Sequence, residues 1–240
     1  PGPPGDHAVQ DAYSLRCAPQ VHGASRDVVA FAAEVAGREL ASVTDNPVVL
    51  VDGEGGQGLV ASTGNFHGQP LAFAADFCAI ALADLSAISE RRTDRLMDPA
   101  RSQGLPAFLA VDAGVNSGFM LAHYTAAAAV NRLRTSAVPA SVDSISTSGG
   151  QEDHVSMGWN AARKLFGSLR DAARVLAVEI LCAAQALELR KLSPSPETQA
   201  VLQRLRAEVA PMAVDRFLAP DLAAAERLVW EGVLLPPWIG

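Results

Sequence analysis

The chain has 240 residues, of which 49% are hydrophobic and 19% are charged, and its formal net charge is -7. The apolar fraction is enough for a substantial core and excludes global disorder, and the acidic balance argues against nucleic acid as the main partner, because phosphate binding needs clustered lysine and arginine. The three cysteines, Cys17, Cys78 and Cys182, have no C-x-x-C spacing, so neither a disulfide framework nor a thiolate zinc site is predicted, and a reducing, cytoplasmic setting fits best.

Targeting and membrane signals are weak. Residues 1–5 are rich in proline and glycine and lack the basic start and apolar run of a secretory signal. The most membrane-like stretch, residues 71–88, is interrupted by Asp76 and Asp84, and each carboxylate would cost a few kcal/mol at the centre of a bilayer. We therefore expect this stretch to form a buried helix of a soluble protein.

The first predicted elements are a helix and a hairpin. Residues 21–40 carry apolar side chains at helical spacing. Thr44-Asp45-Asn46-Pro47 has the composition of a turn, because Asp and Asn cap their own backbone and proline restricts the residue before it. Residues 48–51 and 59–62 are then expected to pair as two short strands, which gives a small β-hairpin near residues 48–62.

The remainder is expected to be helical, with Ser195 and Pro196 as the N-cap and first residue of one helix. The predicted helices cover about residues 70–95, 113–135, 151–192, 197–210 and 221–234. At 1.5 Å per residue the third would be about 60 Å long, whereas a compact domain of this size is roughly 35 Å across, so it should pack against something else. We predict a mainly α protein, a bundle of long antiparallel helices with a small β-hairpin.

Common catalytic motifs give little support to other enzyme classes. Gly53, Gly55 and Gly58 match G-x-G-x-x-G, but a strand-like segment follows where a dinucleotide site needs a helix, so we interpret them as a hairpin loop. No histidine pair has H-x-x-x-H spacing, and Glu152-Asp153-His154 would diverge around a helix axis, so no metal site is predicted. A hydrolase nucleophile is unsupported because G-x-S-x-G does not occur.

Two polar groups have both a functional and a plain interpretation. If residues 10–16 are helical, Tyr13 and Arg16 share a face, and Arg16 could hold a carboxylate through two parallel hydrogen bonds; the alternative is a surface arginine beside a half-buried tyrosine. Ser148 and Gln151 have capping-box spacing, which would place Glu152 in the first turn of the long helix. Glu152 would then present a carboxylate to a pocket or merely complement the helix dipole, and physical reasoning alone favours the dipole.

Five segments, in the right order, resemble those of the aromatic amino-acid ammonia-lyases. Gln10-Asp11-x-Tyr13-Ser14-x-Arg16 with Pro19-Gln20 resembles the Q-D-x-Y-S-x-R-x-x-P-Q segment of that family, and residues 42–47 and 64–68 resemble two more. Residues 139–145 and 151–158 resemble the histidine ammonia-lyase version in particular. The resemblance therefore covers residues 10–158 and implies the family's bundle of long helices.

The resemblance also implies a cofactor. The family builds 4-methylideneimidazol-5-one (MIO) from an Ala-Ser-Gly triplet, and that triplet does not occur in these 240 residues. We therefore expect that this chain does not form MIO and corresponds to the C-terminal half of an ammonia-lyase. It would be a fragment, a nicked product or a natural small subunit, inactive unless a cofactor-bearing N-terminal half or large subunit completes it.

Site residues follow from the same resemblance. Arg16 should bind the substrate carboxylate, Tyr13 should act in catalysis beside the cofactor and the amino group, and Gln10 should support both. Phe66 should pack beside the cofactor ring. Glu152 should face the substrate side chain in binding and catalysis, and a carboxylate suits an imidazole. Since phenylalanine- and tyrosine-specific relatives tend to have glutamine there, the resemblance favours L-histidine as substrate and trans-urocanate as product.

The expected organisation is an active-site segment at residues 1–20 followed by a helical bundle at residues 21–240. Because family members are homotetramers, the expected assembly is a tetramer of lyase units, homo- or hetero-oligomeric, without nucleic acid or membrane. One rival is a split ammonia-lyase or aminomutase subunit for another aromatic amino acid. Another is a non-catalytic structural or regulatory paralogue, against which the joint presence of Tyr13, Arg16, Phe66 and Glu152 argues.

Overall fold

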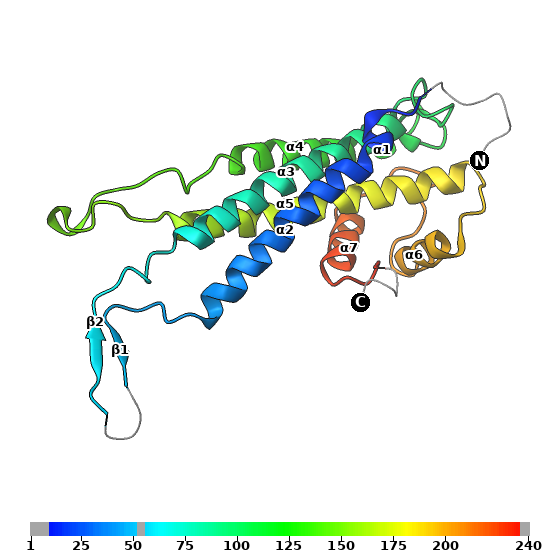
Figure 1. The fold of residues 1–240 in the computed structure, drawn as a ribbon. Coiled ribbons are helices and arrows are strands. Elements are labelled where there is room, and N and C mark those ends of the chain that lie inside the picture. Colours follow the sequence, from blue (N-terminus) through cyan, green and yellow to red (C-terminus); the bar gives the residue numbers. More distant parts are fainter. Residues whose placement is uncertain (1–9, 52–55, 236–240) are drawn as a thin grey trace. The chain divides into compact units, whose positions relative to one another are not determined.

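The computed structural model describes residues 10–51 and 56–235, which form a largely helical chain with one small sheet (Figure 1). The helices and strands in chain order are α1 (Tyr13–Arg16), α2 (Ala18–Ala41), β1 (Val48–Leu50), β2 (Leu59–Ala61), α3 (Gln69–Met97), α4 (Met120–Ser136), α5 (Gly158–Leu189), α6 (Pro196–Arg206) and α7 (Ala219–Trp230). This confirms the predicted mainly α fold with long helices and a small hairpin.

The chain divides into two compact units. The first comprises residues 1–22, 83–133 and 169–240, and the second comprises residues 23–82 and 134–168. Helices α3 and α5 each begin in the second unit and end in the first, whereas α4 begins in the first unit and ends in the second. The separate active-site segment that the sequence suggests for the first twenty residues stays a prediction.

The first unit is built around an apolar core to which five helices, α3 to α7, contribute. Ala122 and Ala126 of α4 are buried there, and their small side chains allow neighbouring helices to approach closely. Large buried side chains come from α5, α6 and α7, such as Val178, Leu181, Leu205 and Leu228, and from the segment between α3 and α4, such as Leu109 and Phe119. Each such side chain contributes about 1.5–3 kcal/mol when it is fully removed from water, so this cluster is the main stabilising element of the unit.

The second unit contains a small alanine-rich core and the hairpin. Ala75 of α3, Ala161 of α5 and Ala140 of the preceding loop are buried together. In the hairpin, Val48 pairs with Ala61 and Leu50 pairs with Leu59 in an antiparallel register. This confirms the predicted strand pair. Of the three glycines predicted to form the hairpin loop, Gly53 and Gly55 lie outside the described residues.

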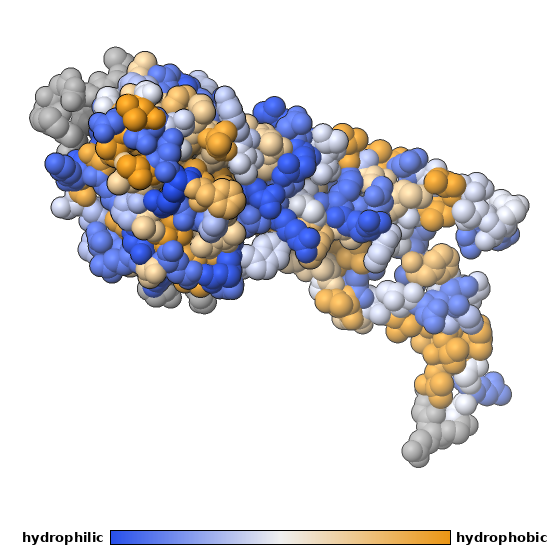
Figure 2. Space-filling view, turned by 180° about the vertical axis from the view of Figure 1, so that it is seen from behind, coloured by the Kyte–Doolittle hydropathy of each residue, from blue (hydrophilic) through white to orange (hydrophobic). Residues whose placement is uncertain are grey.

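Apolar side chains also remain on the surface, where they form orange patches in Figure 2. On α3, Leu71, Phe73, Phe77 and Ile80 are each between 41% and 44% exposed. By length and composition α3 could cross a membrane, but half of its most apolar window is buried, which is also typical of a core helix. One charged residue of α3 is nevertheless buried, since Asp76 is only 1% exposed.

The predicted start of α4 is wrong by seven residues. Residues 113–119 form turns, and α4 begins at Met120. Gly114 and Gly118 have φ angles of 100° and 58°, a left-handed conformation that breaks a right-handed helix. A Cβ atom at Gly118 would lie 2.5 Å from the carbonyl oxygen of Phe108, so tertiary packing requires glycine at this position.

The predicted start of α5 is also wrong. The helix begins at Gly158, so the capping box of Ser148 and Gln151 does not form, and Glu152 lies outside the first turn. Ser148, Gly149 and Gly150 all have positive φ angles, which reverse the chain before the helix. At 1.5 Å per residue the 32 residues of α5 span about 48 Å. The cap at Ser195 is confirmed, since its side chain accepts a hydrogen bond from the Thr198 amide.

Candidate active site

In the first unit, α1 brings Tyr13 and Arg16 together. The guanidinium carbon of Arg16 lies 4.9 Å from the centroid of the Tyr13 ring, which is within the range of a cation–π contact. Tyr13 is 70% exposed, and Arg16 forms no ion pair with the carboxylates of the described residues. The predicted shared face is therefore confirmed, and the guanidinium fork is available to an incoming carboxylate. Gln10 is exposed just before the helix, and its supporting role stays a prediction.

A partly buried ion pair anchors this short helix. The Arg92 side chain donates a hydrogen bond from Nη1 to the carbonyl oxygen of Ser14 at 3.4 Å. Arg92 is itself held by Glu179 of α5, with Nη2 and Oε2 2.8 Å apart, and the Ser89 hydroxyl donates to the same oxygen of Glu179. A four-residue helix has too few internal hydrogen bonds to be stable alone, so this contact fixes the position of α1 on α3.

In the second unit, Phe66 borders a cavity of about 430 Å³ between the end of α2 and the start of α3. Its ring is 59% exposed. The neighbouring Asn65 donates a hydrogen bond from Nδ2 to the carbonyl oxygen of Val43 at 3.2 Å, which ties the loop to the end of α2. The loop therefore presents an aromatic ring from a fixed backbone.

The loop of Phe66 is linked to the loop of Glu152 through two histidines. His67 Nε2 donates a hydrogen bond to the carbonyl oxygen of His154 at 2.9 Å. The two imidazole rings are nearly parallel, with an angle of 4° between them and 5.7 Å between their centroids. No local sequence pattern predicts this contact, because it joins residues 87 positions apart. The structure thus brings together two of the loops that carry predicted site residues.

Glu152 is exposed and closes a tight chain reversal. Its carbonyl oxygen accepts a hydrogen bond from the Thr147 amide at 2.9 Å, and its carboxylate accepts one from the Thr147 hydroxyl. Hydrogen bonds from the hydroxyls of Thr147 and Ser148 hold the pKa of Glu152 below its ordinary value. The carboxylate is therefore ionised at neutral pH and suited to accept a hydrogen bond from a donor or to pair with a cation.

A buried carboxylate supports the loop that leads to Glu152. Asp76 of α3 accepts a hydrogen bond from the Ser141 amide at 2.7 Å, and its other oxygen lies 2.9 Å from Lys164 Nζ. Gln69 adds a hydrogen bond from Nε2 to the carbonyl oxygen of Ser141 at 2.9 Å. Sequence analysis treated Asp76 only as an interruption of an apolar stretch. A single charge on an otherwise apolar helix face was the signal that could have predicted a buried ion pair here, because buried charges are normally paired.

The described parts of the chain contain no group of three or more His, Cys, Asp or Glu side chains that could hold a metal ion. Tyr13, Arg16 and Gln10 belong to the first unit, whereas Phe66 and Glu152 belong to the second. The predicted site residues therefore form two groups, one a guanidinium beside a phenol and the other an aromatic ring and an ionised carboxylate on two linked loops.

Comparison with known proteins decides the family. The profile of the family described as "Aromatic amino acid lyase" matches residues 3–207. The chain belongs to this family. Histidine ammonia-lyase of Streptomyces griseus is 59% identical over 231 residues, which are 95% of this chain and 44% of that protein. Histidine ammonia-lyase of Gloeobacter violaceus is 52% identical over 228 residues, again 95% of this chain and 44% of that protein.

Solved structures of the aromatic amino acid lyase family agree with this fold. Histidine ammonia-lyase from Trypanosoma cruzi superposes with a TM-score of 0.88 at 44% identity, over 93% of this chain and 44% of that chain. Tyrosine aminomutase from Streptomyces globisporus superposes with a TM-score of 0.87 at 38% identity, over 96% of this chain and 45% of that chain. The chain thus spans less than half the length of the relatives that it matches.

The cofactor implied by the family is MIO, whose parent Ala-Ser-Gly triplet these 240 residues do not contain. The residues present fit such a group. The exposed rings of Tyr13 and Phe66 can each contact a planar heterocycle, and the phenolic oxygen of Tyr13 can exchange a proton with a bound amine. The roles of Tyr13 and Phe66 toward MIO stay predictions.

Proposed function

We propose that this chain contributes the substrate-binding residues of a histidine ammonia-lyase, which eliminates ammonia from L-histidine to give trans-urocanate. The observation that carries the proposal is the guanidinium of Arg16, which lies over the Tyr13 ring and is unpaired with carboxylates of the described residues. Such a fork binds a carboxylate through two parallel hydrogen bonds. Relatives named histidine ammonia-lyase at 50% identity or more support the choice of substrate.

The chemistry divides between the two groups of residues. Elimination of ammonia requires an electrophile, which MIO supplies when it is bound. Arg16 binds the substrate carboxylate and so fixes the α-carbon, while the phenolic oxygen of Tyr13 accepts or donates a proton at the amino group. Glu152 accepts a hydrogen bond from an imidazole N–H or pairs with an imidazolium. Its lowered pKa keeps it ionised at the pH at which histidine carries these donors.

We further propose that a cofactor-bearing segment outside these 240 residues completes the site, within an oligomer of lyase units in the cytoplasm. The exposed apolar side chains of α3, including Phe73 and Phe77, support an assembly that covers them. The chain by itself is then expected to form no urocanate. The rivals are an aminomutase, which would yield a β-amino acid, and a paralogue without activity.

The test uses steady-state kinetics of the complete protein with histidine, phenylalanine and tyrosine, followed by urocanate absorbance and by product identification. Arg16→Ala and Arg16→Lys should each lower kcat/KM about a hundredfold or more, because a point charge does not replace the fork. Glu152→Gln should lower the use of histidine more than tenfold and leave binding of a phenyl analogue nearly unchanged.

Asp153→Asn is the matched control for Glu152, since Asp153 is the adjacent exposed carboxylate. Its kinetics should equal those of the wild type. Equal small losses for Glu152→Gln on all three substrates would remove the support for histidine. An unchanged kcat/KM in Arg16→Lys would remove Arg16 from the site.

A further inference from the structure

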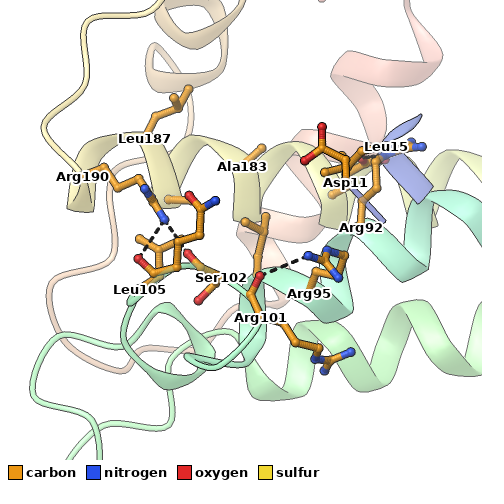
Figure 3. A pocket seen from close by; sticks show the side chains of 14 residues that line it. Asp11, Leu15, Arg92, Arg95, Arg101, Ser102, Leu105, Ala183, Leu187 and Arg190 are labelled. Carbon is orange, nitrogen blue, oxygen red and sulfur yellow. Dashed lines mark hydrogen bonds and ion pairs between the residues drawn. The ribbon is translucent and has the colours of Figure 1, made fainter. Parts of the chain in front are cut away.

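Besides the cavity at Phe66 in the second unit, the first unit contains a cavity of about 450 Å³ whose polar lining is rich in arginine (Figure 3). Its charged lining residues are Arg92, Arg95, Arg101, Arg190, Asp11 and Glu179. The lining thus contains twice as many arginines as carboxylates. The remaining wall is largely apolar and includes Leu96, Leu105 and Leu187.

Two of the four arginines are neutralised by nearby carboxylates and two are not. Arg92 pairs with Glu179, and Arg101 pairs with Asp94 and Asp98 at 2.6 and 2.7 Å. In contrast, Arg95 donates only to the carbonyl oxygen of Arg101, at 3.3 Å. Arg190 donates to the carbonyl oxygens of Ser102 and Gln103. Within residues 10–51 and 56–235, neither Arg95 nor Arg190 forms an ion pair.

A buried hydroxyl in the same lining is unsatisfied. Ser102 is 7% exposed, and its Oγ has no hydrogen-bond partner among the described residues. Buried hydroxyl groups are almost always paired, because leaving one unpaired is unfavourable. An oxyanion in the cavity would accept this hydrogen bond and would also neutralise the two free guanidinium groups. Charge and hydrogen-bonding capacity thus point independently to the same kind of ligand.

The cavity borders a different face of α1 from the one that carries Tyr13 and Arg16. Leu15 of α1 lines it, as does Asp11 just before the helix. Two residues along an α-helix correspond to a rotation of about 200°, so Leu15 points away from Tyr13. The cavity is therefore distinct from the carboxylate-binding fork, although both contact the same short helix.

We propose that this cavity binds a divalent oxyanion of the phosphate monoester class. Arg95 and Arg190 bind the phosphoryl oxygens, the Ser102 hydroxyl donates a further hydrogen bond, and the leucine wall contacts the organic part of the ligand. This site does not depend on the proposed lyase activity. Because Leu15 and Asp11 border the cavity, a bound ligand should restrain α1.

Titration calorimetry of the complete protein, with inorganic phosphate and with phenyl phosphate as probes, tests the site. We expect saturable binding of one anion per chain, with phenyl phosphate several-fold tighter because its ring contacts the leucine wall. Arg95→Gln should weaken phenyl phosphate binding at least tenfold, and Ser102→Ala should weaken it about fivefold. The control Arg134→Gln, at an exposed arginine of α4, should leave binding unchanged.

A second arm separates this cavity from the fork at Arg16. Arg16→Ala should retain phosphate binding, and hydrogen exchange of the amides of residues 13–17 should slow when phenyl phosphate is added. No saturable heat at millimolar phosphate, as expected if another part of the protein fills the cavity, would overturn the proposal. Loss of binding in Arg16→Ala together with normal binding in Arg95→Gln would also overturn it, since the anion would then occupy the fork.

Discussion

Replacing Asp76 by asparagine removes a buried negative charge while keeping the size of the side chain. The carboxylate is 1% exposed, lies 2.9 Å from Lys164 Nζ, and accepts a hydrogen bond from the Ser141 amide at 2.7 Å. The asparagine amide oxygen can still accept from Ser141, but the ion pair with Lys164 is lost. The change therefore tests the charge of Asp76 separately from its shape.

The expected loss of stability follows from the burial of the Asp76 carboxylate. Removing one partner of a buried ion pair costs about 3–5 kcal/mol when the other charge stays buried. Lys164 is 20% exposed and regains part of its hydration, and the hydrogen bond to Ser141 persists. We therefore expect the free energy of unfolding to fall by about 2–3 kcal/mol. At about 2–4 °C per kcal/mol, Tm should fall by roughly 4–12 °C.

The loss should depend on pH. Burial raises the pKa of Asp76, but the hydrogen bonds from Lys164 and Ser141 outweigh it, so the folded pKa lies below the ordinary value of 3.8. A lowered pKa gives stability that is present above pH 3.8 and is lost as the pH falls through the folded pKa. The difference between wild type and Asp76→Asn should therefore be full at pH 7 and shrink below about pH 4.

Thermal unfolding of the complete protein, followed by far-ultraviolet circular dichroism, measures both effects. Asp84→Asn is the matched control, because Asp84 lies two turns further along α3 and is exposed. Its Tm should stay within about 2 °C of the wild-type value. If Asp76→Asn and Asp84→Asn had the same Tm at pH 7, the paired charge would contribute nothing and our reasoning on burial would be refuted.

Three further substitutions test the backbone, the core and a helix cap. In urea unfolding, Gly118→Ala should lower the free energy of unfolding by at least about 1 kcal/mol more than Gly114→Ala. Both glycines have a left-handed backbone, but only at Gly118 would the new Cβ atom lie 2.5 Å from a carbonyl oxygen. Equal losses would attribute the effect to the φ angle alone. Leu181→Ala, at a side chain 1% exposed, should cost about 2–5 kcal/mol, against about 0.5 kcal/mol or less for Leu121→Ala, at a side chain 62% exposed. Ser195→Ala should cost about 1 kcal/mol and increase hydrogen exchange in the first turn of α6; unchanged exchange there would argue against the cap.

Local signals predicted the elements well where the backbone stays regular. The hairpin and the cap at Ser195 depend on turn and capping residues that are adjacent in sequence, so both were predictable. The starts of α4 and α5 were not, because residues with positive φ angles precede both helices, Gly114 and Gly118 before α4 and Ser148 to Gly150 before α5. At position 118 glycine is required because a Cβ atom would lie 2.5 Å from a carbonyl oxygen ten residues earlier, and no local pattern reveals that contact.

The candidate site shows the same limit. The contact of Tyr13 with Arg16 follows from a spacing of three residues in a helix, so the sequence predicted it. The hydrogen bond of His67 to residue 154 and the contact of Asp76 with Ser141 join segments 87 and 65 positions apart. Such contacts are set by tertiary packing, which a single sequence does not specify.

The hairpin has a consequence for how the chain behaves in solution. Its strands are three residues long, and Val49 and Val60 are 60% and 65% exposed, with Val51 beside them at 70%. An apolar strand edge with unpaired backbone groups is a template for pairing with another chain. At high concentration the isolated chain should therefore self-associate through this edge. Lysine at the position of Val51 alone would add a charge beside this edge and should reduce such pairing.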